Sequence, residues 1–184
     1  MAETIKDGTG KGYLAKVNDE NMLDCWSVCE SVEHHSNHDE KQAYHVLFNK
    51  TATGAGDCIF YAKNDSDTDL IVEGFWFRVA SAEQVQIKIG DTGTPASGTT
   101  ITPVNNNAGS SNAAEGTFEH GTDITGLSGG SVVEKYWLTS TASEMFNFEQ
   151  DIVLPKNLTL TIYVVSGSVD VAGTMVFHYH GEGA

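Results

Sequence analysis

Residues 83 to 89 read Glu-Gln-Val-Gln-Ile-Lys-Ile, and this stretch carries the clearest signal for the fold. Its apolar residues Val85, Ile87 and Ile89 alternate with polar ones, which is the pattern of a β-strand with one buried face and one face in water. The same period recurs further along the chain, at Leu158, Leu160, Ile162 and Val164 and at Val171, Gly173, Met175, Phe177 and Tyr179. Repeated strands of this kind predict sheets that share one core.

Other strand-like runs fill much of the remaining chain. They cover residues 22–32, 43–50, 58–62, 70–79, 117–120 and 132–138, with turns rich in Gly, Asn, Asp and Ser between them. Helical spacing is nearly absent, apart from one turn that residues 38–43 could form. Because no helices are available for parallel crossovers, the pattern predicts an all-β protein, an antiparallel β-sandwich of the jelly-roll type.

The 184 residues, 40% of them hydrophobic, suffice for one domain with a sizeable core. Residues 1–12 are polar and Gly-rich and residues 13–17 are strand-like, so we expect an extended N-terminal arm over residues 1–20 and a single β-sandwich domain over residues 21–184. Residues 91–116 are rich in Thr, Asn, Ser and Gly, which predicts a long irregular connection that binds a partner or packs on a neighbouring subunit. A mobile surface loop is the alternative.

Charge narrows the choice of partners. The chain has 25 acidic and 10 basic residues and a formal net charge of −15, so nucleic-acid phosphates and anionic membranes repel it, whereas a basic protein surface does not. No apolar run approaches the roughly 20 residues of a spanning helix, and the first residues lack the layout of a signal peptide. We therefore expect a cytoplasmic protein whose three cysteines are reduced thiols.

Cys25, Cys29, His34, His35 and His38 have spacings that occur among zinc ligands. If residues 22–32 form a strand, however, residues four apart lie about 13 Å from each other and cannot share one ion. The sequence therefore favours a histidine-bearing loop after a strand.

His178 and His180 lie two apart on a predicted strand, about 6 to 7 Å from each other on one face, which permits a shared ion. His45 or His120 would have to supply a third ligand, as in a metal-dependent enzyme of cupin-like shape. A solvent-facing or interfacial histidine pair is the expected alternative.

Asp65, Asp67 and Asp69 imitate the first positions of a calcium loop. Leu70 stands where that loop needs glycine and Trp76 where it needs a glutamate, so an acidic turn is expected instead.

Two glycine-rich segments resemble enzyme motifs in residue type but lack the structural context that those motifs require. Residues 126–130 fit G-x-S-x-G, but the strand-like run that follows them predicts a glycine turn between strands. Residues 8–12 lack the hydroxyl residue and the following helix of a phosphate-binding loop. We expect no enzymatic activity and no cofactor.

Several segments spread along the chain carry a resemblance when taken together: Gly8–Val17, the His-rich Glu33–His38 leading to Ala43–Val46, Thr102–Asn112 and Val153–Leu158. Together they resemble a group of small virion proteins of tailed bacteriophages, described as head decoration (cement) proteins. The resemblance implies a β-sandwich, often trimeric, on the surface of the capsid, and it supplies no catalytic residues.

From this resemblance we expect a decoration protein that is assembled in the host cytoplasm, binds the major capsid protein as a homotrimer and stabilises the shell from outside. The residues expected to contact the capsid or another subunit are Gly8, Gly10, Lys11, Gly12 and Tyr13 in the arm and Asn105, Asn106 and Asn107 in the long connection. The alternative is a tail- or fibre-associated module that recognises carbohydrate on the host. Exposed Trp76 or Trp137 would stack on sugars there, although both are expected to fill the core.

Overall fold

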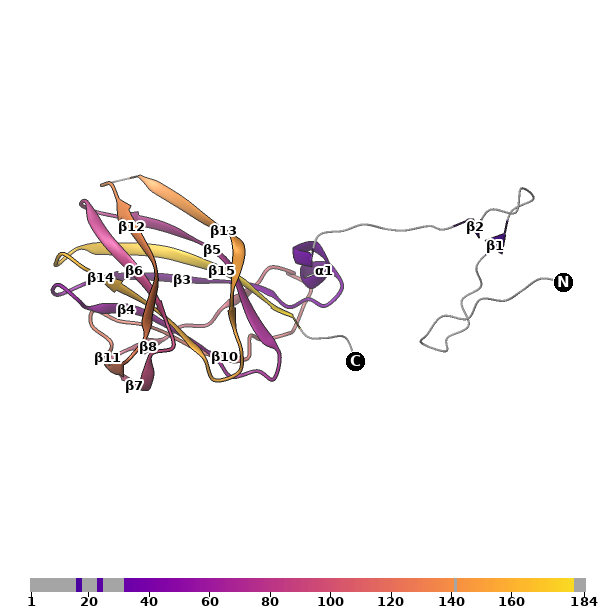
Figure 1. The fold of residues 1–184 in the computed structure, drawn as a ribbon, viewed down its shortest axis with the longest axis horizontal. Coiled ribbons are helices and arrows are strands. Elements are labelled where there is room, and N and C mark those ends of the chain that lie inside the picture. The colour runs from indigo at the N-terminus through magenta and orange to yellow at the C-terminus, as the bar shows by residue number, and fades with distance from the viewer. Residues whose placement is uncertain (1–15, 18–22, 25–31, 141, 181–184) are drawn as a thin grey trace. The chain divides into compact units, whose positions relative to one another are not determined.

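The computed structural model describes residues 16–17, 23–24, 32–140 and 142–180 (Figure 1). The chain divides into two compact units, residues 1–31 and 32–184. In the first unit β1 (Lys16–Val17) pairs antiparallel with β2 (Leu23–Asp24). The predicted contact residues Gly8, Gly10, Lys11, Gly12 and Tyr13 lie outside the described residues, and the predicted division after residue 20 stays a prediction.

The second unit is an antiparallel β-sandwich, which confirms the predicted all-β fold class (Figure 1). One layer is a six-stranded sheet with the order β12 (Ser131–Leu138), β6 (Glu83–Ile89), β14 (Thr159–Val164), β4 (Cys58–Asn64), β10 (Gly116–His120) and β8 (Thr99–Thr100). The other layer is a five-stranded sheet with the order β13 (Ser143–Leu154), β5 (Asp69–Val79), β15 (Asp170–His180), β3 (Ala43–Thr51) and β9 (Val104–Asn105). A separate ribbon pairs β7 (Thr92–Ala96) with β11 (Thr125–Ser128).

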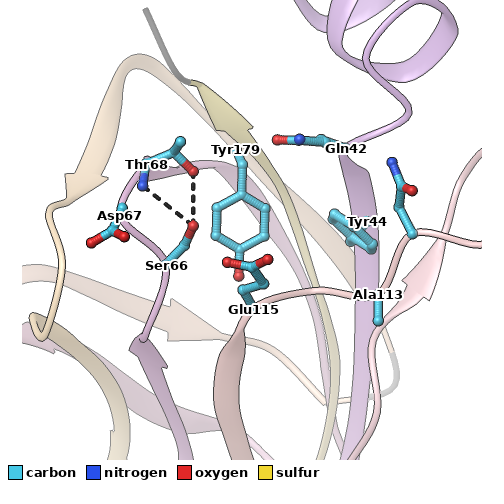
Figure 2. Close-up of a pocket in the computed structure, with 9 residues that line it drawn as sticks. Gln42, Tyr44, Ser66, Asp67, Thr68, Ala113, Glu115 and Tyr179 are labelled. Atoms are coloured by element: carbon cyan, nitrogen blue, oxygen red, sulfur yellow. Dashed lines mark hydrogen bonds between the residues drawn. The ribbon is translucent and has the colours of Figure 1, made fainter.

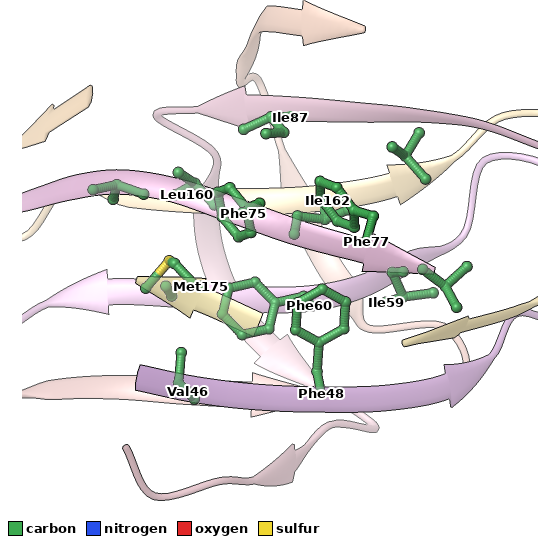
Figure 3. Packing of buried hydrophobic residues seen from close by; sticks show 14 of the residues in the cluster. Val46, Phe48, Ile59, Phe60, Phe75, Phe77, Ile87, Leu160, Ile162 and Met175 are labelled. Atoms are coloured by element: carbon green, nitrogen blue, oxygen red, sulfur yellow. The ribbon is translucent and has the colours of Figure 1, made fainter. Parts of the chain in front are cut away.

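The core between the two sheets is rich in aromatic side chains (Figure 3). Phe48 and Phe60 come from opposite sheets, and their ring centroids lie 4.8 Å apart. Phe75 stacks on Phe77 at 5.3 Å, and all four rings are buried. Gly173 makes room for this packing, because a Cβ at that position would lie 2.3 Å from Cζ of Phe48. The alternating pattern of the sequence therefore fills the core as predicted, with a glycine where a ring needs space.

Residues 90–130, between β6 and β12, form an insertion that reaches both layers. Its strands β8 and β10 extend the six-stranded sheet beyond β4, and β9 extends the five-stranded sheet beyond β3. The insertion therefore adds strands to both sheets on the same side of the sandwich. On the other side, β12 and β13 are the edge strands.

One buried carboxylate fastens the insertion to the sheet. Asp91 is 4% exposed and accepts hydrogen bonds from the Thr161 hydroxyl at 2.5 Å, the Gly130 amide at 2.8 Å and the Tyr163 hydroxyl at 3.2 Å. The Thr159 hydroxyl donates to the backbone carbonyl of Asp91 at 2.7 Å. The polar face of β14, which the alternating pattern placed in water, is thus covered by the insertion.

The structure differs from the predicted elements at four places. Residues 91–116 are not irregular throughout, because β7, β8 and β9 lie within them. β13 was missed, since a shift of register between Asn147 and Ile152 breaks its alternating pattern. Val32 begins the helix α1 (Val32–His38) and does not end a strand, and the turn expected at residues 38–43 is this helix, displaced toward the N-terminus. Residues 25–31 lie outside the described residues.

Candidate functional site

The outer face of the five-stranded sheet is the surface that this sheet turns away from the core. Strand register places Leu47, Thr174, Trp76 and Met145 in one row across β3, β15, β5 and β13. Leu47 is 61% exposed, Trp76 48% and Met145 54%. An exposed row of large apolar side chains on a globular domain is typical of a binding surface.

Helix α1 covers only one end of this outer face. Beneath it the outward-facing Ala43, Ile71 and His178 are buried, and Ser36 of the helix is buried as well. The apolar row lies beyond the covered end. The helix therefore leaves the middle of the outer face open.

Two outward carboxylates lie toward the ends of the sheet: Asp170 begins β15 and bonds to Thr51, and Glu73 contacts His178 at the covered end. Between them the middle of the outer face carries no carboxylate among its described outward positions, although the chain has a net charge of −15. These positions are His45, Leu47, Asn49, Gly74, Trp76, Arg78, Ser143, Met145, Asn147, Ala172, Thr174 and Val176. Elsewhere the acidic surface repels another acidic protein, whereas this face does not. We call it the acid-free face.

A mainly apolar pocket of about 480 Å³ opens on the acid-free face. Leu47, Trp76 and Thr174 line it together with Arg78, and His120 of β10 reaches it from the other sheet. No carboxylate is among the lining residues. The pocket can therefore accept an apolar group next to a hydrogen-bond acceptor.

Sequence reasoning was wrong to place Trp76 and Trp137 in the core, because Trp76 is 48% and Trp137 is 68% exposed. The signal that places Trp76 outside was present in the sequence. Phe75 and Phe77 alternate with Trp76 and Arg78 on one strand, and a strand can bury only one of these two pairs against a single core.

His178 is not solvent-facing, which was one of the two placements expected for the histidine pair. It is 3% exposed, because α1 covers this end of the sheet, and its Nδ1 lies 2.8 Å from the Glu73 carboxylate. His180 is exposed at the end of β15, and His120 lies on the other sheet. In the described parts of the chain no three His, Cys, Asp or Glu side chains come together as a metal site.

The zinc candidates near α1 can be followed only in part. Cys25 and Cys29 lie outside the described residues, as does the side chain of His34. His35 and His38 are exposed, and each contacts the Asp39 carboxylate, at 3.1 Å and 2.7 Å. The hydrogen bond from His38, opposed by slight desolvation, lowers the pKa of Asp39. These two histidines thus lie next to a carboxylate on an exposed helix end.

Asp65 and Asp67 lie in the acidic turn predicted between β4 and β5, and Asp69 begins β5. Asp65 contacts the Lys63 ammonium at 2.6 Å, and Lys156 donates a hydrogen bond to Asp67. Desolvation acts to raise the pKa of Asp65, but the hydrogen bonds from Lys63 and Thr117 outweigh it, so the pKa is lowered. Two of the three carboxylates are thus already matched by lysines.

A polar pocket of about 420 Å³ lies beside this acidic turn (Figure 2). Tyr44 and Tyr179 form its buried wall, with Ser66 and Thr68 on one side and Glu115 in front of the tyrosine hydroxyl. Burial raises the pKa of Tyr179, so its hydroxyl stays neutral. The Tyr44 and Tyr179 rings are buried and pack edge to face against each other, so they offer no exposed ring face on which a ligand could stack.

The predicted contact residues Asn105 and Asn107 hold the chain's own structure together. Asn105 donates to the Lys41 carbonyl at 2.8 Å, and Asn107 donates to the Asn37 carbonyl at 3.1 Å. Asn106 is exposed, and its backbone amide donates to the Ala43 carbonyl. Contact of these asparagines with a capsid or another subunit stays a prediction.

The remaining motifs have structural roles. Residues 126–130 end β11 and turn into β12, with positive φ angles at Gly126 and Gly129, as the predicted glycine turn requires. Cys58 is buried, and desolvation raises the pKa of its thiol to about 12, which keeps it unreactive.

No family model, curated protein or solved structure matches the chain. Among the described residues, no helix has the length and apolar character needed to cross a membrane.

Proposed function

We propose that the protein is a structural component of a bacteriophage virion, a decoration protein that binds the outer surface of the head and stabilises the shell. The observation that carries this proposal is the acid-free face, where Leu47, Trp76 and Met145 are exposed in one row. Burying such a row against a shell protein removes apolar area from water. The acidic remainder of the surface keeps bound copies soluble and apart.

We also infer that the sandwich is a jelly roll, and the order of its long strands supports this. In chain order the eight long strands are β3, β4, β5, β6, β12, β13, β14 and β15. In one sheet the first (β3), eighth (β15), third (β5) and sixth (β13) lie side by side. In the other sheet the second (β4), seventh (β14), fourth (β6) and fifth (β12) lie side by side. Two interleaved Greek keys give this order, and viral capsid domains use the same architecture.

The partners in this proposal are the major capsid protein and two further copies of the chain in a homotrimer on the capsid surface. Nucleic acid is not a partner, because the charge of −15 opposes contact with phosphates. Assembly takes place in the host cytoplasm.

The test uses capsid shells that lack this protein, incubated with purified protein and sedimented. Wild type is expected to bind, and Trp76→Glu to weaken binding roughly thirtyfold or more, because it places a charge in the centre of the contact. Trp137→Glu is the matched control, since Trp137 is exposed on β12 of the other sheet. Absence of wild-type binding, or equal binding by both variants, contradicts the proposal.

A host-recognition module is the second candidate, and the exposure of Trp76 and Trp137 favours it. Exposed indole rings can stack on sugars. A glycan array distinguishes the two candidates: binding to surface glycans that Trp137→Glu abolishes, without binding to shells, selects the second.

A further inference from the structure

Arg78 is the only arginine of the chain, and it is exposed on the acid-free face. It lines the apolar pocket next to Trp76, which lies two residues earlier on β5 and faces the same side. Trp and Arg are the residues that most often dominate the binding energy of protein interfaces. The pocket thus combines both types around one apolar floor.

The guanidinium of Arg78 makes no hydrogen bond or ion pair with another described residue. Asp170 lines a neighbouring small hollow together with Arg78, but its carboxylate accepts a hydrogen bond from Thr51 instead. Although the chain has 25 acidic residues, no carboxylate of a described residue pairs with its one arginine. Five N–H donors in a planar fork are available to a ligand.

His120 adds a second unpartnered group at the margin of the pocket. Its Nδ1 is buried and has no hydrogen-bond partner among the described residues. Desolvation, together with the positive charge of Lys50, lowers the pKa of His120, so the imidazole is neutral at neutral pH. A neutral imidazole can accept or donate one further hydrogen bond.

These groups define the chemistry of the occupant. Leu47 and Trp76 favour an apolar side chain, and Arg78 favours a carboxylate close to it. A cationic group is disfavoured, because no carboxylate lines the pocket and Arg78 repels it. A polypeptide segment with an acidic residue flanked by aliphatic residues supplies both features.

We infer that the pocket between Trp76 and Arg78 anchors a partner segment in which a carboxylate pairs with Arg78 and a neighbouring apolar side chain fills the pocket. The inference rests on the proposed function in taking the capsid protein as the owner of that segment. The chemistry of the pocket stands apart from this assignment and is tested separately.

The first test is an NMR titration of the full chain, labelled with ¹⁵N. Because Arg78 is the only arginine, its side-chain Nε–H gives a single signal, and the Trp76 indole is identified with the Trp76→Phe variant. The probes are the peptides acetyl-Leu-Glu-Leu-amide and acetyl-Leu-Gln-Leu-amide. The glutamate peptide is expected to shift both signals and to bind about tenfold more tightly, as loss of a charge-assisted hydrogen bond predicts.

A neutral monosaccharide, glucose, is titrated as a third probe. Three results overturn the inference: neither peptide shifts the signals, both peptides bind with equal affinity, or glucose shifts the signals and the peptides do not. Arg78→Gln must abolish the difference between the peptides. Lys135→Gln, which removes an exposed cation from β12, must keep it.

The second test measures binding of the same two variants to shells. Arg78→Gln is expected to bind about tenfold more weakly than Lys135→Gln. If wild type binds shells and Arg78→Gln binds equally well, the inference fails and the proposed function stands. If the peptides discriminate but wild type does not bind shells, the proposed function fails and the pocket chemistry stands.

Discussion

Replacement of Asp91 by asparagine tests how the long insertion is held. The side chain is 4% exposed and accepts three hydrogen bonds, from Thr161, Gly130 and Tyr163. An asparagine of the same shape carries no charge and keeps only one accepting oxygen, so it cannot accept from the Gly130 amide and from the Thr161 and Tyr163 hydroxyls in the same way. A hydrogen bond to a charged group contributes about 1.5 to 3 kcal/mol, and a buried donor without a partner adds a cost of its own.

We therefore expect Asp91→Asn to lower the free energy of unfolding by about 2 to 3 kcal/mol. For a chain of this length that corresponds to a fall in Tm of roughly 4 to 12 °C. Differential scanning calorimetry and guanidinium unfolding measure the effect. Hydrogen exchange is expected to show faster exchange first in β7 and β11, because the insertion loosens before the two main sheets.

The matched control is Asp123→Asn. Asp123 lies in the same insertion, and no hydrogen bond joins its carboxylate to another described residue. This variant removes the same charge and is expected to change stability by less than about 0.5 kcal/mol. If the two variants unfold at the same temperature, net charge and not the hydrogen-bonded carboxylate determines the effect, and the reasoning is refuted.

Three further outcomes are expected. Gly173→Ala brings a methyl group against the Phe48 ring, and it should cost about 1 to 3 kcal/mol in guanidinium unfolding; an unchanged midpoint would mean that the ring moves aside freely. Cys58, with its pKa near 12, should not react with a thiol reagent at pH 8 in a variant whose two N-terminal cysteines are serine, until denaturant is added; rapid reaction of the folded protein counts against its burial. Desolvation acts to raise the pKa of Asp57, but hydrogen bonds from Thr53 and Gly54 outweigh it, so the pKa is lowered in the folded state. The stability that Asp57 contributes is therefore present above the unfolded pKa and is lost as the pH falls. Stability measured from pH 6 down to pH 3 should fall less steeply in Asp57→Asn than in wild type, and parallel curves would contradict this.

Alternation of apolar and polar residues was enough to predict the sandwich, because Val85, Ile87, Leu160 and Ile162 each face a single shared core. It failed at β13, where Phe146 and Phe148 obey the pattern but a register shift interrupts it. A period of two carries no information about a bulge, which depends on the partner strand.

The candidate site was missed for a different reason. Trp76 and Arg78 could be placed on the outer side of a strand from their neighbours, but the open pocket also depends on Leu47 and Thr174, which other strands bring alongside. The acid-free face likewise can be recognised only when the strand order is known, because its residues come from separate strands. Local sequence patterns predict which face of a strand a residue lies on, but only the strand order of the sheet determines which residues of other strands lie next to it.

The insertion also determines how the sandwich responds to mechanical load. On one side β9 and β10, which belong to a single stretch of chain, pair with β3 and β4 of the two sheets, so the layers are tied there through backbone hydrogen bonds. On the other side β12 and β13 end their sheets. These two edge strands follow one another in the chain, with only residues 139–142 between them. A force that pulls the layers apart therefore meets a covalent link on both sides, through residues 139–142 between β12 and β13 and through residues 106–115 between β9 and β10.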